Sequence, residues 1–506
     1  MLNKISSQKV NIIEILYCCL ISIVFISICS TSSPLYPLNM WNDSNCFFTV
    51  GKSMFDGVVV YSEIYEQKGI LLYFLHGIAS IISYDSFLGV WVLEVIFFAV
   101  FLNFAAKTIL LFIDDNKAVI IVLPILSMIL LTDKTFSFGD SAEEFVLPLY
   151  MAFIYHSIKY FKGEQERYSF KRAIIDGGLI GCVFWIKFNL IAFFAGYIIC
   201  ILANYLFRKC YKEAIHYLAG ISIGAVLATI PWIIYFLVTD SIYDWIYYYF
   251  YANTALYTVK TTTIDLLFFI KNIYLYLLET SGQIIVLGVV GIIFVMLSNK
   301  KIKNVFGRWG IVVTYFLTVI GVWIGGINHA YYGFALAVFV TFGLIACYNG
   351  VKSVNSEFIS KKTKKHETVF LVILYLGIAA ATYWGANAHN MMWVDKNEIA
   401  QYQFAEIINK TEDATLLNYG SLDGGFYTAA GIVPNCKYFC MTNNTELTEM
   451  KKVQDEFVKE AKVDYVVTCN DDPIPKFLAD NYKLVIEKTE TYGTASSIYR
   501  LYERIE

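Results

Sequence analysis

Residues 34–69 read PLYPLNMWNDSNCFFTVGKSMFDGVVVYSEIYEQKG, a polar stretch between strongly apolar ones. Its charged residues are Asp43, Lys52, Asp56, Glu63, Glu66 and Lys68. The apolar run 11–33 precedes it, and the runs 70–84 and 87–113 follow it. A helix of about 20 apolar residues is long enough to cross a bilayer. The stretch is therefore predicted to be a loop that leaves the membrane after a first span.

The composition of the whole chain supports a membrane protein. Of 506 residues, 57% are hydrophobic and only 16% are charged, whereas soluble domains carry about 25% charged residues. The net charge of -3 is unevenly distributed: residues 1–385 hold 27 basic and 23 acidic residues, and residues 386–506 hold 12 and 19. A disordered chain is excluded by the high hydrophobicity. A basic nucleic-acid footprint is absent, so no nucleic-acid partner is expected.

The apolar runs predict about eleven transmembrane helices. Two further stretches, 70–84 and 263–279, are short or interrupted and are predicted to lie along the outer interface without crossing. The predicted spans are 11–33, 87–113, 117–132, 145–161, 173–187, 189–207, 215–238, 280–298, 309–327, 332–349 and 367–385.

Positive charge predicts the orientation of these spans. Lys and Arg in short loops favour the cytoplasmic side. With the eleven spans above, six loops and ends on one side hold 21 basic residues, and the other side holds six. We therefore expect a multi-pass protein of the cytoplasmic membrane with its N-terminus inside and residues 386–506 outside.

Residues 386–506 are predicted to form a separate, extracytoplasmic α/β domain that follows a transmembrane domain of residues 1–385. Its β-type runs are 415–419, 463–469, 483–487 and 497–502, and its helical runs are 396–409, 445–462 and 474–481. This domain could bind an acceptor or could only cover the site. Cys436 and Cys440 could form a disulfide in an oxidising compartment, or could stay reduced.

Polar groups gather on the predicted outer face. The second outer loop, residues 133–145, reads DKTFSFGDSAEEF and contains Glu143 and Glu144. A later edge, GGINHAYYG, contains His329 and Tyr332, and Lys187 lies where the fifth span emerges. Charged residues at membrane depth are rare unless a function retains them. The outer face is therefore the predicted location of a lipid-accessible site.

These residue types fit one kind of chemistry. A carboxylate such as Asp43 can act as a general base toward a hydroxyl, and Lys68 and Lys187 can neutralise a phosphate. The remaining candidates for binding either substrate, the donor with its phosphate or the acceptor with its hydroxyl, are Glu63, Glu66, Glu143, Glu144, His329 and Tyr332. The acids could also bind Mg²⁺ or Mn²⁺, but no spacing requires a metal, and no cofactor is required by the pattern.

Structural interpretations of the same residues stay open. Asp43 could cap a helix, and Lys68 could extend to the interface without binding a ligand. Glu143 and Glu144 could stabilise a helix N-terminus through the helix dipole. Lys187 could form a purely structural ion pair.

The first loop resembles a signature of bacterial GT-C glycosyltransferases, a family related to the protein O-mannosyltransferases and the aminoarabinose transferase. The segments around Glu143, Lys187 and His329 resemble later elements of that family in the expected order. In the first loop the matching residues are Asp43, Gly51, Lys52, Gly57, Tyr61, Glu63, Lys68, Gly69 and Tyr73.

The resemblance implies a function. Members of the family transfer a monosaccharide from a polyprenyl-phosphate donor, outside the cytoplasmic membrane, with inversion at the anomeric carbon. By this resemblance Asp43 would be the catalytic base, Lys68 would hold the lipid phosphate, and Glu143 or Glu144 would assist binding. The acceptor would be an extracytoplasmic glycan, a teichoic-type polymer, a lipid or a protein, and membrane lipids would surround the site.

Two other functions remain open at this stage. A transporter or flippase of lipid-linked sugars would need polar residues through the whole bilayer, and only Glu94 and Asp176 hint at such a path. An O-acyltransferase would need a histidine within the membrane, for which His76, His156 and His329 are the candidates.

Overall fold

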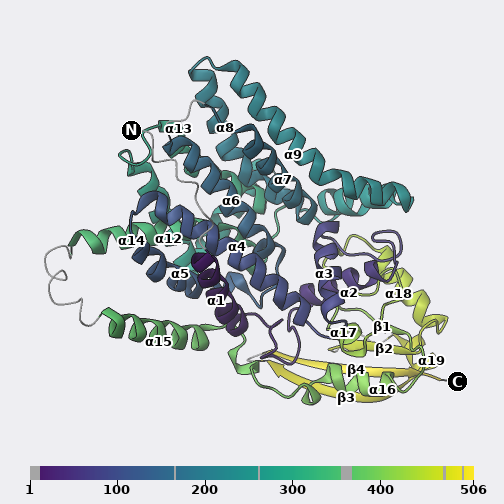
Figure 1. The fold of residues 1–506 in the computed structure, drawn as a ribbon. Helices are drawn as coiled ribbons and strands as arrows, with labels where there is room; N and C mark the ends of the chain where they lie inside the picture. The colour runs from purple at the N-terminus through teal and green to yellow at the C-terminus, as the bar shows by residue number, and fades with distance from the viewer. Residues whose placement is uncertain are drawn as a thin grey trace.

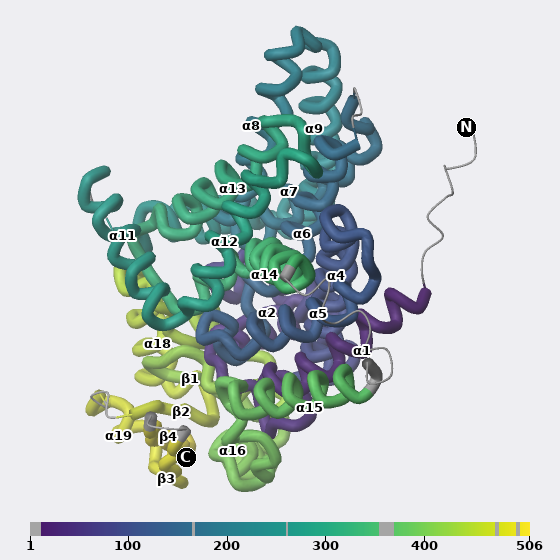
Figure 2. Tube along the Cα trace, turned by 90° about the vertical axis from the view of Figure 1, so that its left-hand side faces the viewer, coloured from purple at the N-terminus to yellow at the C-terminus, as the bar shows by residue number. Residues whose placement is uncertain are grey.

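The chain folds into a large helical body with a small C-terminal α/β region packed against one end of it (Figure 1). The computed structural model describes residues 12–505 apart from 164–166, 260–261, 355–366, 471–474 and 493–494. Figure 2 shows the same arrangement after a quarter turn, with the sheet again at one end of the helices.

Every apolar run identified in the sequence coincides with a helix. The helices of the body are α1 (Ile12–Cys29), α2 (Asn42–Phe55), α3 (Ile70–Ile82), α4 (Leu88–Phe112), α5 (Asn116–Leu131), α6 (Ala142–Lys162), α7 (Phe170–Ile186), α8 (Ala192–Phe207), α9 (Tyr211–Val238), α10 (Ile242–Trp245), α11 (Thr263–Thr280), α12 (Gly282–Leu297), α13 (Val305–Trp323), α14 (Val340–Val354) and α15 (Glu367–Gly385). Short 3₁₀ segments connect them at η1 (Lys134–Phe136), η2 (Phe188–Ile191) and η4 (Ala330–Phe339), and η3 (Ile246–Leu256) is a π-helix.

The protein is a multi-pass membrane protein. Judged by helix length and apolar composition, its described residues form fewer membrane-spanning helices than the eleven that the sequence predicts. Within the described residues, six helices are long and apolar enough to cross a membrane, or seven if the bent pair α11 and α12 forms one span. These two helices meet at 108°. Helices α3, α5 and most of α15 are apolar but shorter than a full span. The count of eleven therefore stays a prediction.

Helices α7 and α9 pack closely through glycines. A Cβ atom on Gly224 of α9 would lie 1.9 Å from the carbonyl oxygen of Ile174, and one on Gly177 of α7 would lie 2.0 Å from that of Ile221. Small residues at such crossings let two backbones touch, which is how membrane helices gain packing energy without a hydrophobic driving force.

Helix α6 is capped by Ser141. Its side chain accepts a hydrogen bond of 3.0 Å from the backbone N–H of Glu144, which satisfies one of the free donors of a helix start. The Glu144 carboxylate reaches back past the cap and accepts a hydrogen bond of 2.8 Å from the backbone N–H of Asp140. These two bonds fix the position of this end of α6.

The C-terminal region is a four-stranded sheet with helices around it, as the sequence predicts. The strand order is β1-β2-β4-β3, with β1 and β2 parallel and the other neighbours antiparallel. Its elements are η5 (His389–Met391), η6 (Lys396–Glu398), α16 (Ala400–Ile408), β1 (Leu416–Asn418), α17 (Phe426–Ala430), α18 (Glu449–Lys459), β2 (Tyr465–Cys469), α19 (Lys476–Asn481), β3 (Tyr482–Tyr492) and β4 (Ala495–Arg504).

The C-terminal region is attached to α2 by buried polar contacts. The carboxylate of Asp423 accepts a hydrogen bond of 2.7 Å from the Thr49 hydroxyl and one of 2.8 Å from the backbone N–H of Gly425. The ammonium of Lys52, on the same helix, donates to the carbonyl oxygen of Tyr427 at 3.2 Å. Lys52 and Asp423 are both fully buried, so this interface holds two ionisable groups away from water.

The cysteines at this interface differ from the pairing considered in the sequence. The structure contains no disulfide among the described residues. The Sγ atom of Cys440 lies 3.5 Å from that of Cys46 on α2. Cys440 therefore packs across the interface, and the Cys436–Cys440 bridge is not formed.

We predict that Asp423 makes the stability of the protein depend on pH. Burial raises the pKa of Asp423 to about 6, whereas an unfolded Asp has a pKa of about 4. The folded state then binds the proton more tightly, so the free energy of unfolding falls as pH rises from about 4 to 6, by roughly 2–3 kcal/mol. Asp423→Asn keeps an acceptor for the Gly425 N–H and should flatten this slope. Thermal unfolding of the solubilised protein between pH 4 and 7 measures it, and equal slopes for both proteins would contradict the prediction.

Candidate active site

The first loop brings Asp43 and Lys68 to the same face of α2. Asp43 lies in the first turn of α2, and Phe47 follows one turn later. The ammonium of Lys68 lies 5.1 Å from the centre of the Phe47 ring. Residues four apart share a helix face, so the carboxylate and the ammonium line one side of the helix although 24 residues separate them in the sequence.

Lys68 is a buried cation held by Glu66. Its ammonium is 3.7 Å from Oε1 of Glu66, and the other oxygen of Glu66 accepts hydrogen bonds from the Lys68 backbone N–H at 2.8 Å and the Tyr73 hydroxyl at 2.5 Å. Burial by itself would lower the pKa of Lys68, but the negative charges of Glu66 and Asp43 outweigh it and raise that pKa above its ordinary value. Lys68 is therefore charged at neutral pH.

Gly69 brings this loop against the end of α7. Its backbone N–H donates to the carbonyl oxygen of Ile186 at 3.0 Å. A Cβ atom at this position would lie 2.0 Å from the carbonyl oxygen of Trp185. Only glycine permits this approach, and it places Lys68 beside Lys187, which directly follows α7.

Lys187 pairs with Glu143 and faces two tyrosines. Its ammonium donates a 2.6 Å hydrogen bond to Oε1 of Glu143. The same ammonium lies 3.8 Å from the ring centre of Tyr332 and 5.5 Å from that of Tyr331. The Tyr331 hydroxyl donates at 3.0 Å to Oδ2 of Asp43. Tyr331 therefore links the second lysine to the carboxylate of α2.

His329 completes the group. Its ring stacks on Tyr331 at 5.6 Å between centres, and its Nε2 lies 3.0 Å from the hydroxyl of Tyr257. Burial lowers the pKa of His329, against the charge of Asp43, and the positive charges of Lys68 and Lys187 lower it further. The imidazole is therefore neutral at pH 7.

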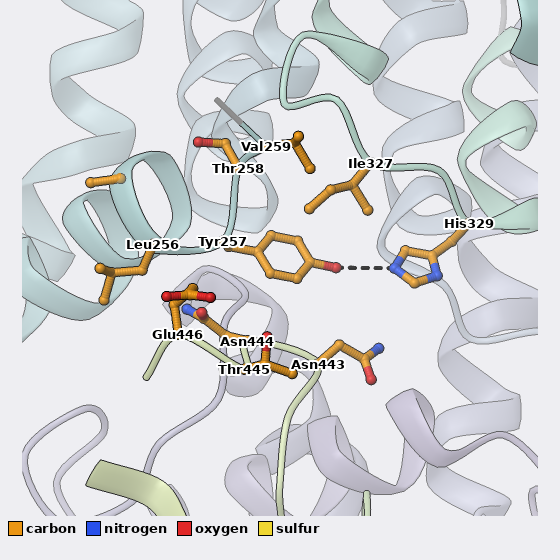
Figure 3. A pocket seen from close by; sticks show the side chains of 11 residues that line it. Leu256, Tyr257, Thr258, Val259, Ile327, His329, Asn443, Asn444, Thr445 and Glu446 are labelled. Carbon is orange, nitrogen blue, oxygen red and sulfur yellow. Dashed lines mark hydrogen bonds between the residues drawn. The ribbon is translucent and has the colours of Figure 1, made fainter. Parts of the chain in front are cut away.

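Two adjoining cavities open at these residues. The smaller one, of about 130 Å³, is lined by Lys68, Lys187 and Tyr332 together with apolar and uncharged polar side chains. The larger one, of about 560 Å³, is lined by His329 and by a loop of the C-terminal region (Figure 3). Tyr257, Thr258 and Ile327 line both cavities.

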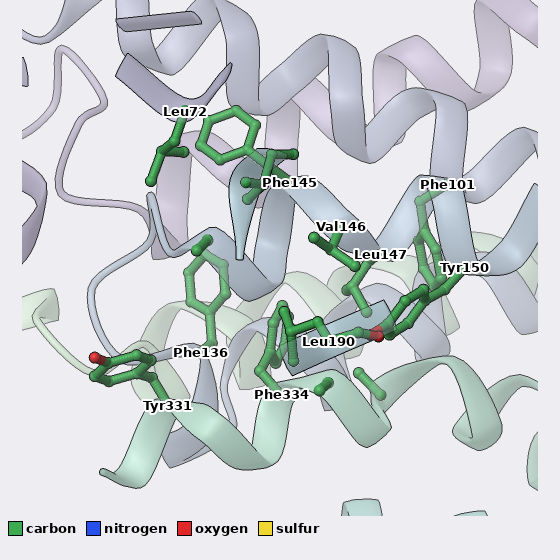
Figure 4. Close-up of a cluster of buried hydrophobic side chains, with 14 of the residues drawn as sticks. Leu72, Phe101, Phe136, Phe145, Val146, Leu147, Tyr150, Leu190, Tyr331 and Phe334 are labelled. Carbon is green, nitrogen blue, oxygen red and sulfur yellow. The ribbon is translucent and has the colours of Figure 1, made fainter. Parts of the chain in front are cut away.

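A cluster of buried hydrophobic side chains packs beside the site (Figure 4). Leu72 of α3, Phe145 of α6 and Phe136 of η1 are fully buried there, beside Tyr331 and Phe334 of η4. The rings of Phe136 and Phe334 lie 5.5 Å apart. Because Tyr331 belongs to this cluster, the hydroxyl that reaches Asp43 is carried on an anchored ring.

Behind α2 lies a buried polar network around Asp140. Its carboxylate accepts a hydrogen bond from the Ser44 hydroxyl and lies 2.9 Å from Nε2 of His76. The other ring nitrogen of His76 lies 2.8 Å from the carbonyl oxygen of Leu72. Burial by itself would lower the pKa of His76, but the charge of Asp140 outweighs it and raises that pKa. The Asp140 backbone N–H is shared between Glu94 at 2.9 Å and Glu144 at 2.8 Å.

The structure distinguishes Glu143 from Glu144, which the sequence treated as equivalent candidates. Glu143 faces Lys187 in the site, whereas Glu144 caps α6 and belongs to the Asp140 network. Glu63 is exposed, accepts a hydrogen bond from the Val59 backbone N–H, and lines neither cavity. The other predicted site residues, Asp43, Glu66, Lys68, Lys187, His329 and Tyr332, lie together as described above.

Several residues of the site were not among the sequence candidates. The sequence placed Tyr331 and Asp140 among the polar groups of the predicted outer face but assigned neither a role. Tyr257 was hidden in the aromatic stretch 242–257, which resembles an ordinary interfacial belt. The loop 443–446 carries no motif.

A metal-ion site is not evident in the part of the chain that the structure describes. There, no three or more His, Cys, Asp and Glu side chains are grouped so that they could hold a metal ion. The carboxylates Glu66 and Glu143 face lysines instead. Use of Mg²⁺ or Mn²⁺ therefore stays a prediction.

Comparison with known proteins finds similarity only at the level of structure. No protein-family profile and no curated protein matches the sequence. The crystal structure of ArnT from Cupriavidus metallidurans bound to undecaprenyl phosphate matches with a TM-score of 0.59 and 11% identity over 97% of both chains. The apo state of that protein also gives 0.59, with 12% identity. An Archaeoglobus fulgidus oligosaccharyltransferase in complex with Zn and sulfate gives 0.47, with 12% identity over 90% of this chain and 67% of the other.

These matches establish the fold. The ArnT structure aligns with nearly the whole chain, including the C-terminal region. The predicted GT-C membrane fold is therefore confirmed. Identity of 11–12% carries no further conclusion about residues or substrates.

We predict that Gly69→Ala disrupts the site. The added methyl group would overlap the Trp185 carbonyl oxygen, so the loop must move away from α7 and separate Lys68 from Lys187. Overpacking of this kind costs about 1–3 kcal/mol. The variant should unfold at a lower temperature than the unaltered protein, measured by intrinsic tryptophan fluorescence. Gly377→Ala is the control, because a Cβ there meets nothing within 4 Å, and equal unfolding temperatures for both variants would contradict the prediction.

Proposed function

We propose that this chain is an inverting glycosyltransferase that moves a monosaccharide from a polyprenyl-phosphate donor to an acceptor hydroxyl on the exoplasmic face of the membrane. The observation that supports the proposal is the convergence of Asp43, Lys68 and Lys187 around Phe47 and Tyr331, with both lysines lining one cavity. A fold shared with a protein whose crystal structure contains undecaprenyl phosphate supports the choice of donor.

Asp43 is the proposed general base. Tyr331 donates to its Oδ2 atom, and within the described residues its Oδ1 atom has no hydrogen-bond partner. Asp43 accepts the proton of the acceptor hydroxyl, and the resulting oxygen attacks the anomeric carbon. The bond between that carbon and the phosphate oxygen breaks on the opposite face of the sugar, which inverts the anomeric configuration.

Lys68 and Lys187 are proposed to stabilise the departing phosphate. An ammonium has three donors, and Lys187 uses one of them for Glu143. Both lysines line a cavity with largely apolar walls, where electrostatic interactions are stronger than in water. Preorganised cations of this kind stabilise charge that develops in a transition state.

A transporter for lipid-linked sugars is less well supported. Glu94 accepts hydrogen bonds from Ser30 and from the Asp140 backbone. Asp176 is bound by His156 and Tyr168. Glu94 and Asp176 are therefore already bound to other groups of the protein. An assay with a radiolabelled donor separates the two functions, because an enzyme cleaves the donor and a transporter moves it intact.

We predict that Asp43→Asn abolishes transfer without impairing donor binding. The amide cannot accept the proton, and a general base contributes about 10²–10⁴-fold to a rate. Release of polyprenyl phosphate from a radiolabelled polyprenyl-phosphate sugar should fall by at least about 100-fold. Asp240→Asn, at an exposed position on the same predicted face, is the control. Near-normal turnover by Asp43→Asn would remove the proposed base.

We predict that Lys68→Gln weakens binding of the lipid phosphate. A hydrogen bond to a charged group contributes about 1.5–3 kcal/mol, which corresponds to roughly 10–100-fold in affinity. Titration of the purified protein with undecaprenyl phosphate measures this loss. Lys134→Gln removes an exposed lysine of η1 and should bind like the unaltered protein. If the two variants bind equally well, Lys68 does not contact the phosphate.

A further inference from the structure

The larger cavity lies between the helical body and the C-terminal region. From the body, the end of η3 with the following residues and the segment before η4 line it, and from the C-terminal region the loop 443–446 closes it (Figure 3). Its volume of about 560 Å³ lies within the range of small-molecule sites. It is therefore large enough for one or two sugar rings.

This cavity connects directly to the proposed site of chemistry. It shares Tyr257, Thr258 and Ile327 with the smaller cavity that contains both lysines. The hydrogen bond between Tyr257 and His329 crosses the boundary. His329 stacks on Tyr331, whose hydroxyl holds Asp43. The larger cavity is therefore connected to Asp43 through the rings of His329 and Tyr331.

The polar groups of the larger cavity differ from those of the smaller one. The smaller cavity is lined by two lysines and by the amides of Gln67, Asn189 and Asn253. The larger one is lined by Asn443, Asn444, Thr445 and Glu446 of the C-terminal loop and by no Lys or Arg among the described residues. Amides, hydroxyls and carboxylates together supply both donors and acceptors. This mixture suits a molecule that is rich in hydroxyl groups.

Asn444 and Glu446 bear on which ligand the larger cavity can bind. Asn444 is 1% exposed, and its Oδ1 atom has no hydrogen-bond partner among the described residues, which is costly unless a ligand supplies one. Glu446 is exposed and lines the cavity, and a carboxylate at this position repels phosphate. The groups seen in this cavity therefore disfavour a phosphate-bearing ligand.

We propose that the larger cavity is the acceptor subsite and that its ligand is an uncharged glycan, bound through Asn443, Asn444 and Glu446 of the C-terminal loop. This inference rests on the proposed glycosyltransferase function and narrows it, because it selects a neutral sugar hydroxyl over a phosphate-bearing polymer. The C-terminal region is then part of the substrate site.

The test measures binding of glycans and of lipid phosphate separately. The full chain in nanodiscs is loaded with undecaprenyl phosphate and titrated with fluorescent probes of two kinds and of matched length. The neutral probes are hexose and N-acetylhexosamine oligosaccharides, and the charged probe is oligo(glycerol phosphate). We expect the neutral probes to bind more tightly. The double variant Asn443→Ala, Glu446→Ala should weaken their binding by about tenfold and leave binding of undecaprenyl phosphate unchanged.

The controls keep the outcomes distinct. Asn443 and Glu446 are exposed loop residues, so their removal should not unfold the protein, and Glu412→Ala changes an exposed acid elsewhere in the same region. Preference for oligo(glycerol phosphate), absence of binding by every neutral probe, or an unchanged affinity in the double variant would each overturn the acceptor assignment. Loss of undecaprenyl-phosphate binding by the unaltered protein would instead overturn the proposed function.

Discussion

Asp140 joins four helices at one buried position. Its carboxylate binds Ser44 of α2 and His76 of α3, and its backbone N–H is shared by Glu94 of α4 and Glu144 of α6. Its backbone is in the left-handed region, with φ of 63°, a conformation that Asp tolerates better than most residues. A buried carboxylate without partners would be very costly, so the four helices are held where these partners meet. The proposed base directly precedes the serine in this network, and its position therefore depends on it.

The two lysines of the site each lie beside a glutamate. A lone buried ammonium would be strongly disfavoured, but Glu66 and Glu143 each compensate one lysine. The glutamates use only part of the donor capacity of each ammonium. The proposed phosphate site could therefore be filled without first breaking a complete set of hydrogen bonds, and preorganisation of this kind reduces the cost of binding.

Helix α2 is fixed on two sides. Ser44 ties its first turn to the helical body, and Thr49 and Lys52 tie its later turns to the C-terminal region. The C-terminal region thus contributes to the position of α2 as well as to the wall of the larger cavity. This double attachment explains physically why the α/β region packs against the helix that carries the proposed base, and it makes domain packing and site geometry interdependent.

The sequence by itself determined the membrane class, the helical segments and the α/β character of the C-terminal region, because hydrophobic runs and β-type patterns are local properties. It also placed Asp43 and Lys68 in one loop. The tertiary structure decided which acids face which cations: Glu143 meets Lys187, whereas its neighbour Glu144 turns to cap α6. Likewise, the contact of Cys440 with Cys46 and the cavity beside loop 443–446 depend on segments far apart in the chain. No local pattern encodes such pairings, since they arise only when the helices and the sheet pack together.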